Sequence, residues 1–168
     1  MLNLLRDGAA RKQETRRLYD DLVSRARAPV FFTAFGVADS IDGRFDLLAF
    51  HAWLALKALK AAGLDKAAQG LTDIVFTGFD EAMREQGAGD MGLGHKLRTF
   101  ANAFYGRLAA YDAAPDEARL AAALARNLWR GAAADARAHA LAAYARNAQT
   151  CLERGLPRTL DFGPLPVL

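Results

Sequence analysis

Residues 44–62 are apolar on almost every side, and this constrains the fold more than any other feature of the sequence. A helix that is apolar all round lies either at the centre of a core or under a partner. We therefore expect the rest of the chain to pack around this segment. Its large apolar residues are Phe45, Leu47, Leu48, Phe50, Trp53, Leu54, Leu56 and Leu59.

The other segments also carry apolar residues at helical spacing. From Leu64 to Ala82, and again from Leu93 to Tyr111, apolar or small residues follow one another at steps of three or four, which is the period of one helix face. Alanine is abundant and β-branched residues are sparse, which favours helix throughout. The sequence predicts six main helices, at about residues 9–27, 44–62, 65–86, 95–111, 115–130 and 132–154.

Local signals suggest where these helices begin and end. Asp7 and Asp42 are suitable N-caps for the first and second helices. The short aromatic segment 29–36 predicts one or two helical turns that end at Gly36, and residues 90–94 predict a turn. The tail from residue 156 has three prolines and is expected to be extended, with apolar residues that can still pack. The prediction is an all-α, single-domain, bundle-like fold over residues 1–168.

Composition narrows the class of protein. A chain of 168 residues with 52% hydrophobic and 24% charged residues is typical of one globular domain. One cysteine cannot form an internal disulfide, which indicates a reducing compartment. No apolar run approaches the ~18 residues of a membrane span. The apolar run at the N-terminus is too short for a signal peptide. We expect a cytoplasmic protein, with a peripheral position at the inner membrane as the alternative.

The net charge of +3 is unevenly distributed, with mildly basic ends and a mildly acidic middle. Basic ends suit an anionic membrane surface or RNA, although they are also compatible with an ordinary helical protein rich in arginine. The basic segments lack zinc-finger spacing and a sheet of stacking aromatic residues, so nucleic-acid recognition has weak support.

No group of residues has the pattern of a catalytic, metal or cofactor site. The histidines are His51, His95 and His139, and no two of them share one face of a helix. Cys151 could act as a nucleophile only if a histidine approached it in space, and a buried inert thiol is the simpler interpretation. We therefore expect no enzyme, no metal and no cofactor.

Two glycine-containing segments superficially resemble binding loops. With Gly43 at the invariant glycine of an EF-hand, the first and last ligand positions are Ala38 and Ala49, where acidic residues are required. Residues 87–94 are rich in glycine but follow a helix and lack the Gly-Lys-Ser/Thr ending of a phosphate loop. Neither segment predicts a ligand.

Glycines inside predicted helices are the first sign of close packing. Gly70, Gly78 and Gly106 each cost about 1 kcal/mol relative to alanine, which the approach of another backbone, from this fold or from a partner, can offset. Aromatic residues cluster beside these sites, and most of them are expected in the core. An aromatic groove left exposed by so small a bundle would mark a protein-binding site. The aromatic residues are Phe31, Phe32, Phe35, Phe45, Phe76, Phe79, Phe100, Phe104 and Tyr105.

An ordered series of short motifs resembles the ubiquinol–cytochrome c chaperone family. The motifs are Tyr19-Asp20 with residues 26–29, Phe31-Phe32 leading to Gly36-Val37, the loop Asp39-Ser40-Ile41-Asp42-Gly43-Arg44-Phe45-Asp46, His51, residues 83–90, and Phe100-Ala101-Asn102-Ala103-Phe104-Tyr105-Gly106-Arg107 followed by Tyr111. They span about residues 19–112. Ser40, Gln86 and Ala88 stand where the family pattern has threonine, methionine and valine.

The resemblance implies a helical assembly chaperone without a cofactor or a small-molecule substrate. Its client would be cytochrome b, or another membrane-protein subunit of respiratory complex III. The resemblance also implies a second small helical assembly factor and contact with the ribosome. A chain without a long N-terminal extension is similar to bacterial members.

On this basis we expect a partner-binding surface in the middle of the sequence. Its residues are Asp39, Asp42, Arg44, Phe45, Asp46, Arg84, Asp90, Phe104, Tyr105, Gly106 and Arg107. Arg44 and Arg107 have an alternative role, in which they pair with these carboxylates inside the fold. The alternative functions are a helical adaptor or oligomerisation module, and a protein that binds RNA or a membrane surface.

Overall fold

The structure is a computed structural model that describes residues 2–85, 90–131 and 133–168. Within these ranges the chain is all-α, with six helices of 12 residues or more, one short helix and no strand. The helices are α1 (Leu2–Ala26), α2 (Val30–Thr33), α3 (Ile41–Ala61), α4 (Asp65–Glu85), α5 (Asp90–Asp112), α6 (Glu117–Leu128) and α7 (Ala136–Gly155). The predicted fold class and the short aromatic helix are thus confirmed. None of the described helices combines the length and the apolar character needed to cross a bilayer.

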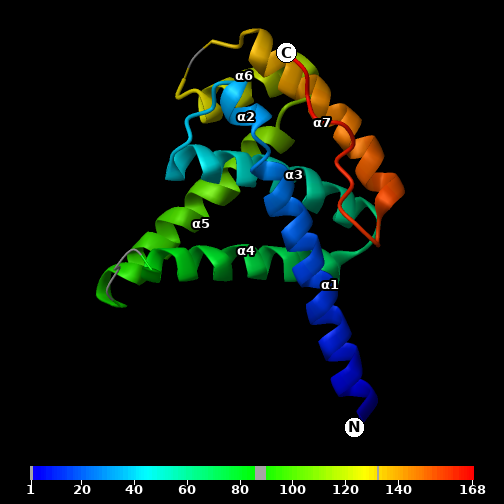
Figure 1. Cartoon of the computed structure of the whole chain (residues 1–168). Coiled ribbons are helices and arrows are strands. Elements are labelled where there is room, and N and C mark those ends of the chain that lie inside the picture. Colours follow the sequence, from blue (N-terminus) through cyan, green and yellow to red (C-terminus); the bar gives the residue numbers. More distant parts are fainter. Residues whose placement is uncertain (1, 86–89, 132) are drawn as a thin grey trace.

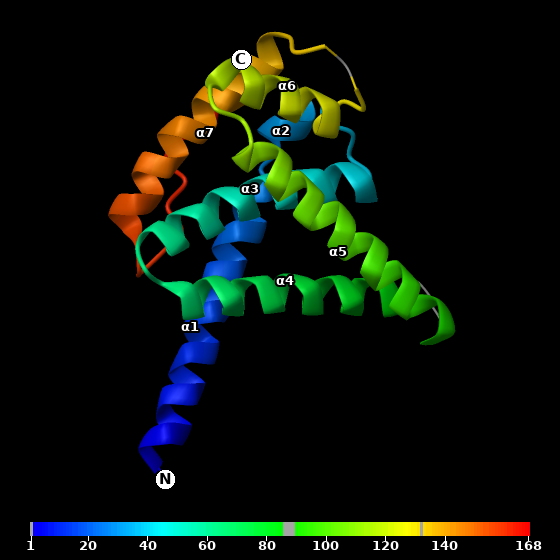
Figure 2. The same cartoon turned by 180° about the vertical axis from the view of Figure 1, so that it is seen from behind.

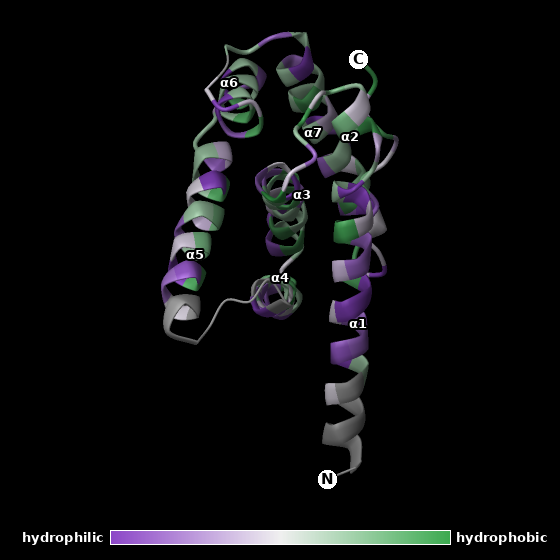
Figure 3. Ribbon diagram, turned by 60° about the vertical axis from the view of Figure 1, so that its left-hand side comes forward, coloured by the Kyte–Doolittle hydropathy of each residue, from purple (hydrophilic) through white to green (hydrophobic). Residues whose placement is uncertain are grey.

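Helix α3 is the centre of the molecule, as its apolar sequence predicts. Thirteen of its 21 residues are buried, and it packs against α1, α4, α5, α6 and α7. Figure 3 shows α3 above α4 in a middle layer, with α5 on one side and α1 on the other. The segment that is apolar all round is therefore covered by the chain itself.

Helices α3 and α4 form a hairpin that opens away from its turn. Gly63 in the turn has a positive φ of 70°, which a residue without a Cβ adopts without strain. The two helices separate toward the start of α3 and the end of α4 (Figures 1 and 2). Helix α1 crosses this hairpin on one face and continues beyond the body of the fold toward the N-terminus.

The predicted caps of the first two helices are wrong, for local reasons. Helix α1 already begins at Leu2, so Asp7 lies inside it. Helix α3 begins at Ile41, and Ser40 is its cap, with extended backbone and a hydroxyl that accepts from the Gly43 amide at 3.1 Å. Asp42 lies in the first turn instead, where the helix dipole still favours an acid.

Three further boundaries differ from the sequence prediction. The turn expected over residues 90–94 is the start of α5, and the glycine-rich residues 87–89 lie outside the described residues. Helix α6 begins after its cap Asp116, so Pro115 precedes it. Helix α7 begins after Asp135, whose carboxylate accepts from the amides of Arg137 and Ala138.

The C-terminal tail is extended, as predicted, and part of it joins the core. Asp21 of α1 accepts hydrogen bonds from the Thr159 hydroxyl at 2.9 Å and from the Leu160 amide at 3.1 Å. Arg25 donates to the Gly163 carbonyl at 2.6 Å, and Phe162 is buried. The last apolar side chains, those of Leu165, Val167 and Leu168, are exposed.

Candidate functional site

An apolar groove of about 210 Å³ lies at the open end of the α3–α4 hairpin. Four helices contribute to it, because α1 covers one side of the opening and α5 the other. Its principal apolar residues are Val23 of α1, Phe45 and Leu48 of α3, Val75 and Phe79 of α4, and Phe100 of α5. We call this feature the apolar groove.

Stacked aromatic rings form part of the wall of the apolar groove. Phe79 and Phe100 are nearly parallel, with 3.5 Å between their ring centroids. Phe45 lies 5.1 Å from the same Phe100 ring. These contacts join α3, α4 and α5 and fix the shape of the opening. Phe45 and Phe79 are only partly buried, so their rings remain accessible from solvent.

The rim of the apolar groove combines an exposed apolar side chain with two arginines. Ile41, in the first turn of α3, is 64% exposed. Arg44 pairs with Asp39 at 2.6 Å, and both side chains are more than half exposed. The hydrogen bond from Arg44 lowers the pKa of Asp39 below its ordinary value. Arg27, at the end of α1, is also exposed.

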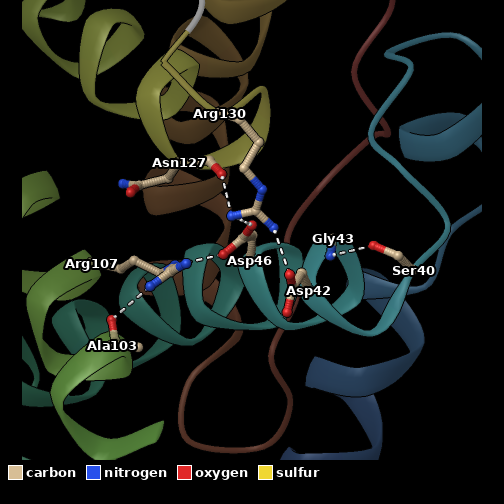
Figure 4. A network of polar contacts seen from close by, with 8 residues as sticks. All are labelled: Ser40, Asp42, Gly43, Asp46, Ala103, Arg107, Asn127 and Arg130. Atoms are coloured by element: carbon tan, nitrogen blue, oxygen red, sulfur yellow. Dashed lines mark hydrogen bonds and ion pairs between the residues drawn. The ribbon is translucent and has the colours of Figure 1, made fainter. Parts of the chain in front are cut away.

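Beside the apolar groove, Asp46 is the centre of an internal ion-pair network (Figure 4). Its carboxylate is fully buried, 2.6 Å from Nε of Arg107 and 3.1 Å from Nη1 of Arg130. Arg130 also lies 3.5 Å from Asp42, and Arg107 donates to the carbonyl of Ala103. Burial raises the pKa of Asp46, and the two guanidinium groups partly oppose that shift. The network ties α3 to α5 and to the segment after α6.

The Asp46 network also supports the wall of the apolar groove. The Arg107 guanidinium lies 4.6 Å from the centroid of the Phe45 ring, in cation–π geometry. Arg107 is only 17% exposed. Both arginines with two suggested roles have a partner within the chain: Arg107 pairs with the buried Asp46, and Arg44 pairs with Asp39 at the exposed rim.

The structure separates the predicted partner-binding residues into groups. Arg44 and Phe45 line the apolar groove and Asp39 pairs at its rim, whereas Asp42, Asp46 and Arg107 belong to the internal network. The remaining residues do not line the groove: Phe104 is buried, Tyr105 and Gly106 are exposed elsewhere on α5, Arg84 pairs with Asp80, and the side chain of Asp90 lies outside the described part of the chain.

Sequence reasoning missed several residues of the apolar groove. Phe79 and Phe100 belong to the aromatic cluster that the sequence predicts, but nothing in the sequence pairs them with each other. Val23 belongs to α1 and Arg27 directly follows that helix, so both are distant in sequence from α4. Only Ile41 has a local signal, since an apolar residue in the first turn of a helix has few partners there.

Contacts within the fold explain two of the three glycines that the sequence analysis singled out inside predicted helices. A Cβ on Gly70 would lie 2.9 Å from Oγ1 of Thr15, and one on Gly78 would lie 2.6 Å from Oη of Tyr19. Helix α1 therefore passes close to α4 at both positions. Among the described residues, a Cβ on Gly106 would meet no atom within 4 Å, so no contact with them requires that glycine.

His51 is part of the core. Its Nδ1 lies 2.8 Å from the Leu47 carbonyl and its Nε2 lies 3.2 Å from Oη of Tyr144. Burial lowers the pKa of His51 to about 3, so the ring is neutral. A neutral ring donates through Nδ1 to Leu47 and accepts at Nε2 from the Tyr144 hydroxyl. Both nitrogens thus have structural partners.

Comparisons with known proteins agree with this architecture. Residues 33–159 match a family model described as Ubiquinol-cytochrome C chaperone. The chain is also similar to the crystal structure of a Cbp3 homolog from Brucella abortus, with a TM-score of 0.79 and 35% sequence identity. The match covers 90% of this chain and 87% of that chain. No curated protein gave a significant match.

Proposed function

Because the chain belongs to the ubiquinol–cytochrome c chaperone family, we propose that it binds cytochrome b during assembly of the ubiquinol–cytochrome c reductase complex. The observation that carries the proposal is the family match over residues 33–159, which includes the α3, α4 and α5 walls of the apolar groove. A membrane-protein subunit exposes apolar surface before it is assembled, and an apolar groove is a suitable place to hold such surface.

The proposed client surface is the apolar groove together with its rim. Arg44 and Phe45 contact the client directly, and Asp39 holds Arg44 in place. The buried Asp46 and Arg107 act indirectly, because they position Phe45. Tyr105 and Gly106 form a second proposed contact on α5, which is available to a further assembly factor. The protein would work at the cytoplasmic face of the membrane that receives the client.

Affinity capture from membranes of a respiring bacterial host tests this function. We expect the tagged chain to recover cytochrome b, and a strain without the protein to contain less assembled reductase. The variant Ile41→Asp places a charge at the rim of the apolar groove and should reduce recovery about tenfold, the equivalent of about 1.4 kcal/mol. Arg107→Glu is unsuitable, because it would leave Asp46 buried beside a second carboxylate.

Val167→Asp is the matched control for Ile41→Asp. Val167 is 85% exposed and lies in the C-terminal tail, so the same change of chemistry occurs away from the apolar groove. Circular dichroism of both variants checks that the helices are intact. The proposed function is rejected if the wild-type chain recovers no cytochrome b and its removal leaves the amount of reductase unchanged.

A further inference from the structure

Within the described residues, the charges around the apolar groove leave Arg27 without a carboxylate partner. Arg44 pairs with Asp39, and Asp42 pairs with Arg130. In the part of the chain that the structure describes, no carboxylate pairs with Arg27, which is exposed and lines the groove.

Among the residues whose side chains the structure describes, none that lines the apolar groove is acidic. Asp80, on the same turn of α4 as Phe79, pairs with Arg84. Glu81 lines the neighbouring cleft between α1 and α4 rather than this one. An occupant that buried a cation here would meet Arg27, whereas an occupant with a carboxylate would pair with it. The groove is therefore complementary to an apolar segment that carries negative charge at one end.

The shape and fold of the apolar groove favour a helix as its occupant. A volume of about 210 Å³ admits a few side chains rather than a whole helix, so the occupant lays one face into the opening. The described part of the fold has no strand whose edge could pair with an extended chain. A helix brings its backbone hydrogen bonds already satisfied, so it loses none by entering an apolar site.

We propose that the apolar groove receives one face of an apolar client helix, and that Arg27 recognises a carboxylate at the end of that helix. This inference rests on the proposed function, because it takes the helix to be part of the client. In this proposal the apolar wall provides most of the affinity, and Arg27 selects the client segment and sets its orientation.

Two synthetic helical peptides test the proposal on the purified full-length chain. Both are apolar sequences of about 18 residues rich in leucine and alanine, one with two aspartates at one end and the other with two lysines there. Fluorescence anisotropy measures their affinities. We expect the wild-type chain to bind the aspartate peptide about tenfold more tightly. Arg27→Glu should reverse this preference.

Arg17→Glu is the matched control. Arg17 is exposed on α1, the helix that Arg27 directly follows, but it does not line the apolar groove, so this variant should keep the wild-type preference. Equal affinities of the wild-type chain for the two peptides would reject recognition by charge. Unchanged peptide binding in Ile41→Asp would reject the location. A dimer that Ile41→Asp converts to monomer in sedimentation equilibrium would assign the groove to a second copy of the chain and so reject the proposal.

Membrane capture of cytochrome b, run in parallel, separates this inference from the proposed function. If the wild-type chain recovers cytochrome b but does not discriminate between the peptides, only the recognition by Arg27 is rejected. If it discriminates between the peptides as expected but recovers no cytochrome b, the groove specificity is retained and the proposed client is rejected.

Discussion

At the scale of single residues, the two buried polar side chains of α3 explain how a helix that is otherwise apolar has one defined position. Asp46 and His51 are both fully buried. Asp46 is held by arginines from α5 and from the segment after α6, and His51 by Tyr144 of α7. A buried carboxylate without its partners is strongly destabilising. Other rotations of α3 would break these pairs, so they select the observed packing.

The depressed pKa of His51 predicts a loss of stability in mild acid. In the unfolded chain His51 binds a proton near its ordinary pKa of 6.5, whereas the folded chain resists protonation until about pH 3. As pH falls through this window, the unfolded state binds more protons. The free energy of unfolding should therefore fall by up to about 1.4 kcal/mol per pH unit from this group alone.

His51→Asn removes this titration and keeps an amide donor for the Leu47 carbonyl. We expect the variant to be less stable at pH 7, because Tyr144 loses its acceptor. The difference in unfolding free energy between wild type and variant should then shrink steadily toward pH 4. Urea unfolding across this pH range measures it, and a difference that stays constant would contradict a neutral His51.

At the scale of helices, two glycines provide opposite predictions. A Cβ on Gly43 would lie 2.0 Å from the carbonyl oxygen of Ala38, so Gly43→Ala forces the backbone at the start of α3 to move. We expect the free energy of unfolding to fall by about 2 kcal/mol, in the range measured for overpacked cores.

Gly106→Ala places its methyl group in open space and should stabilise α5 by about 0.5–1 kcal/mol. Thermal unfolding of both variants checks the prediction, and a loss of stability in Gly106→Ala would contradict it.

The sequence predicts the presence of each helix more reliably than it predicts the residues at which the helix begins and ends. Apolar residues spaced along a whole helix identify α3, α4 and α5, whereas an end depends on one or two hydrogen bonds. Asp42 and Ser40 are both good caps by residue type, and only the backbone decides between them, since Ser40 is extended while Asp42 is already helical. In the same way, the start of α5 at Asp90 has no distinguishing residue pattern.

At the scale of the whole molecule, the candidate site was predicted only in part. Asp39, Arg44 and Phe45 are neighbours in the sequence, so one motif places all of them at one end of α3. Phe79 and Phe100 belong to α4 and α5, and Arg27 directly follows α1. These three residues meet only because α1 crosses the open α3–α4 hairpin and α5 covers its other side (Figure 3). Crossing angles depend on packing of whole surfaces, which a single sequence does not show residue by residue.

The C-terminal tail is expected to contribute to the stability of the whole fold through Phe162. This ring is 1% exposed, lies 5.4 Å from the His51 ring and carries the Arg25 guanidinium at 5.7 Å. Phe162→Ala should therefore lower the free energy of unfolding by about 3–5 kcal/mol, as urea unfolding would measure. Val167→Ala, at a position 85% exposed in the same tail, should leave the unfolding midpoint unchanged.

The single cysteine distinguishes local release of the tail from general loss of stability. Gly163 packs against Cys151, which is partly exposed, and a Cβ on Gly163 would lie 2.7 Å from its Sγ. In Phe162→Ala the tail should detach more often and uncover the rest of the partly exposed thiol, so a thiol reagent should modify Cys151 faster than in the wild-type chain. Measured well below the unfolding transition, unchanged Cys151 reactivity beside a large loss of stability would mean that the tail stays docked and that Phe162 acts only by filling the core.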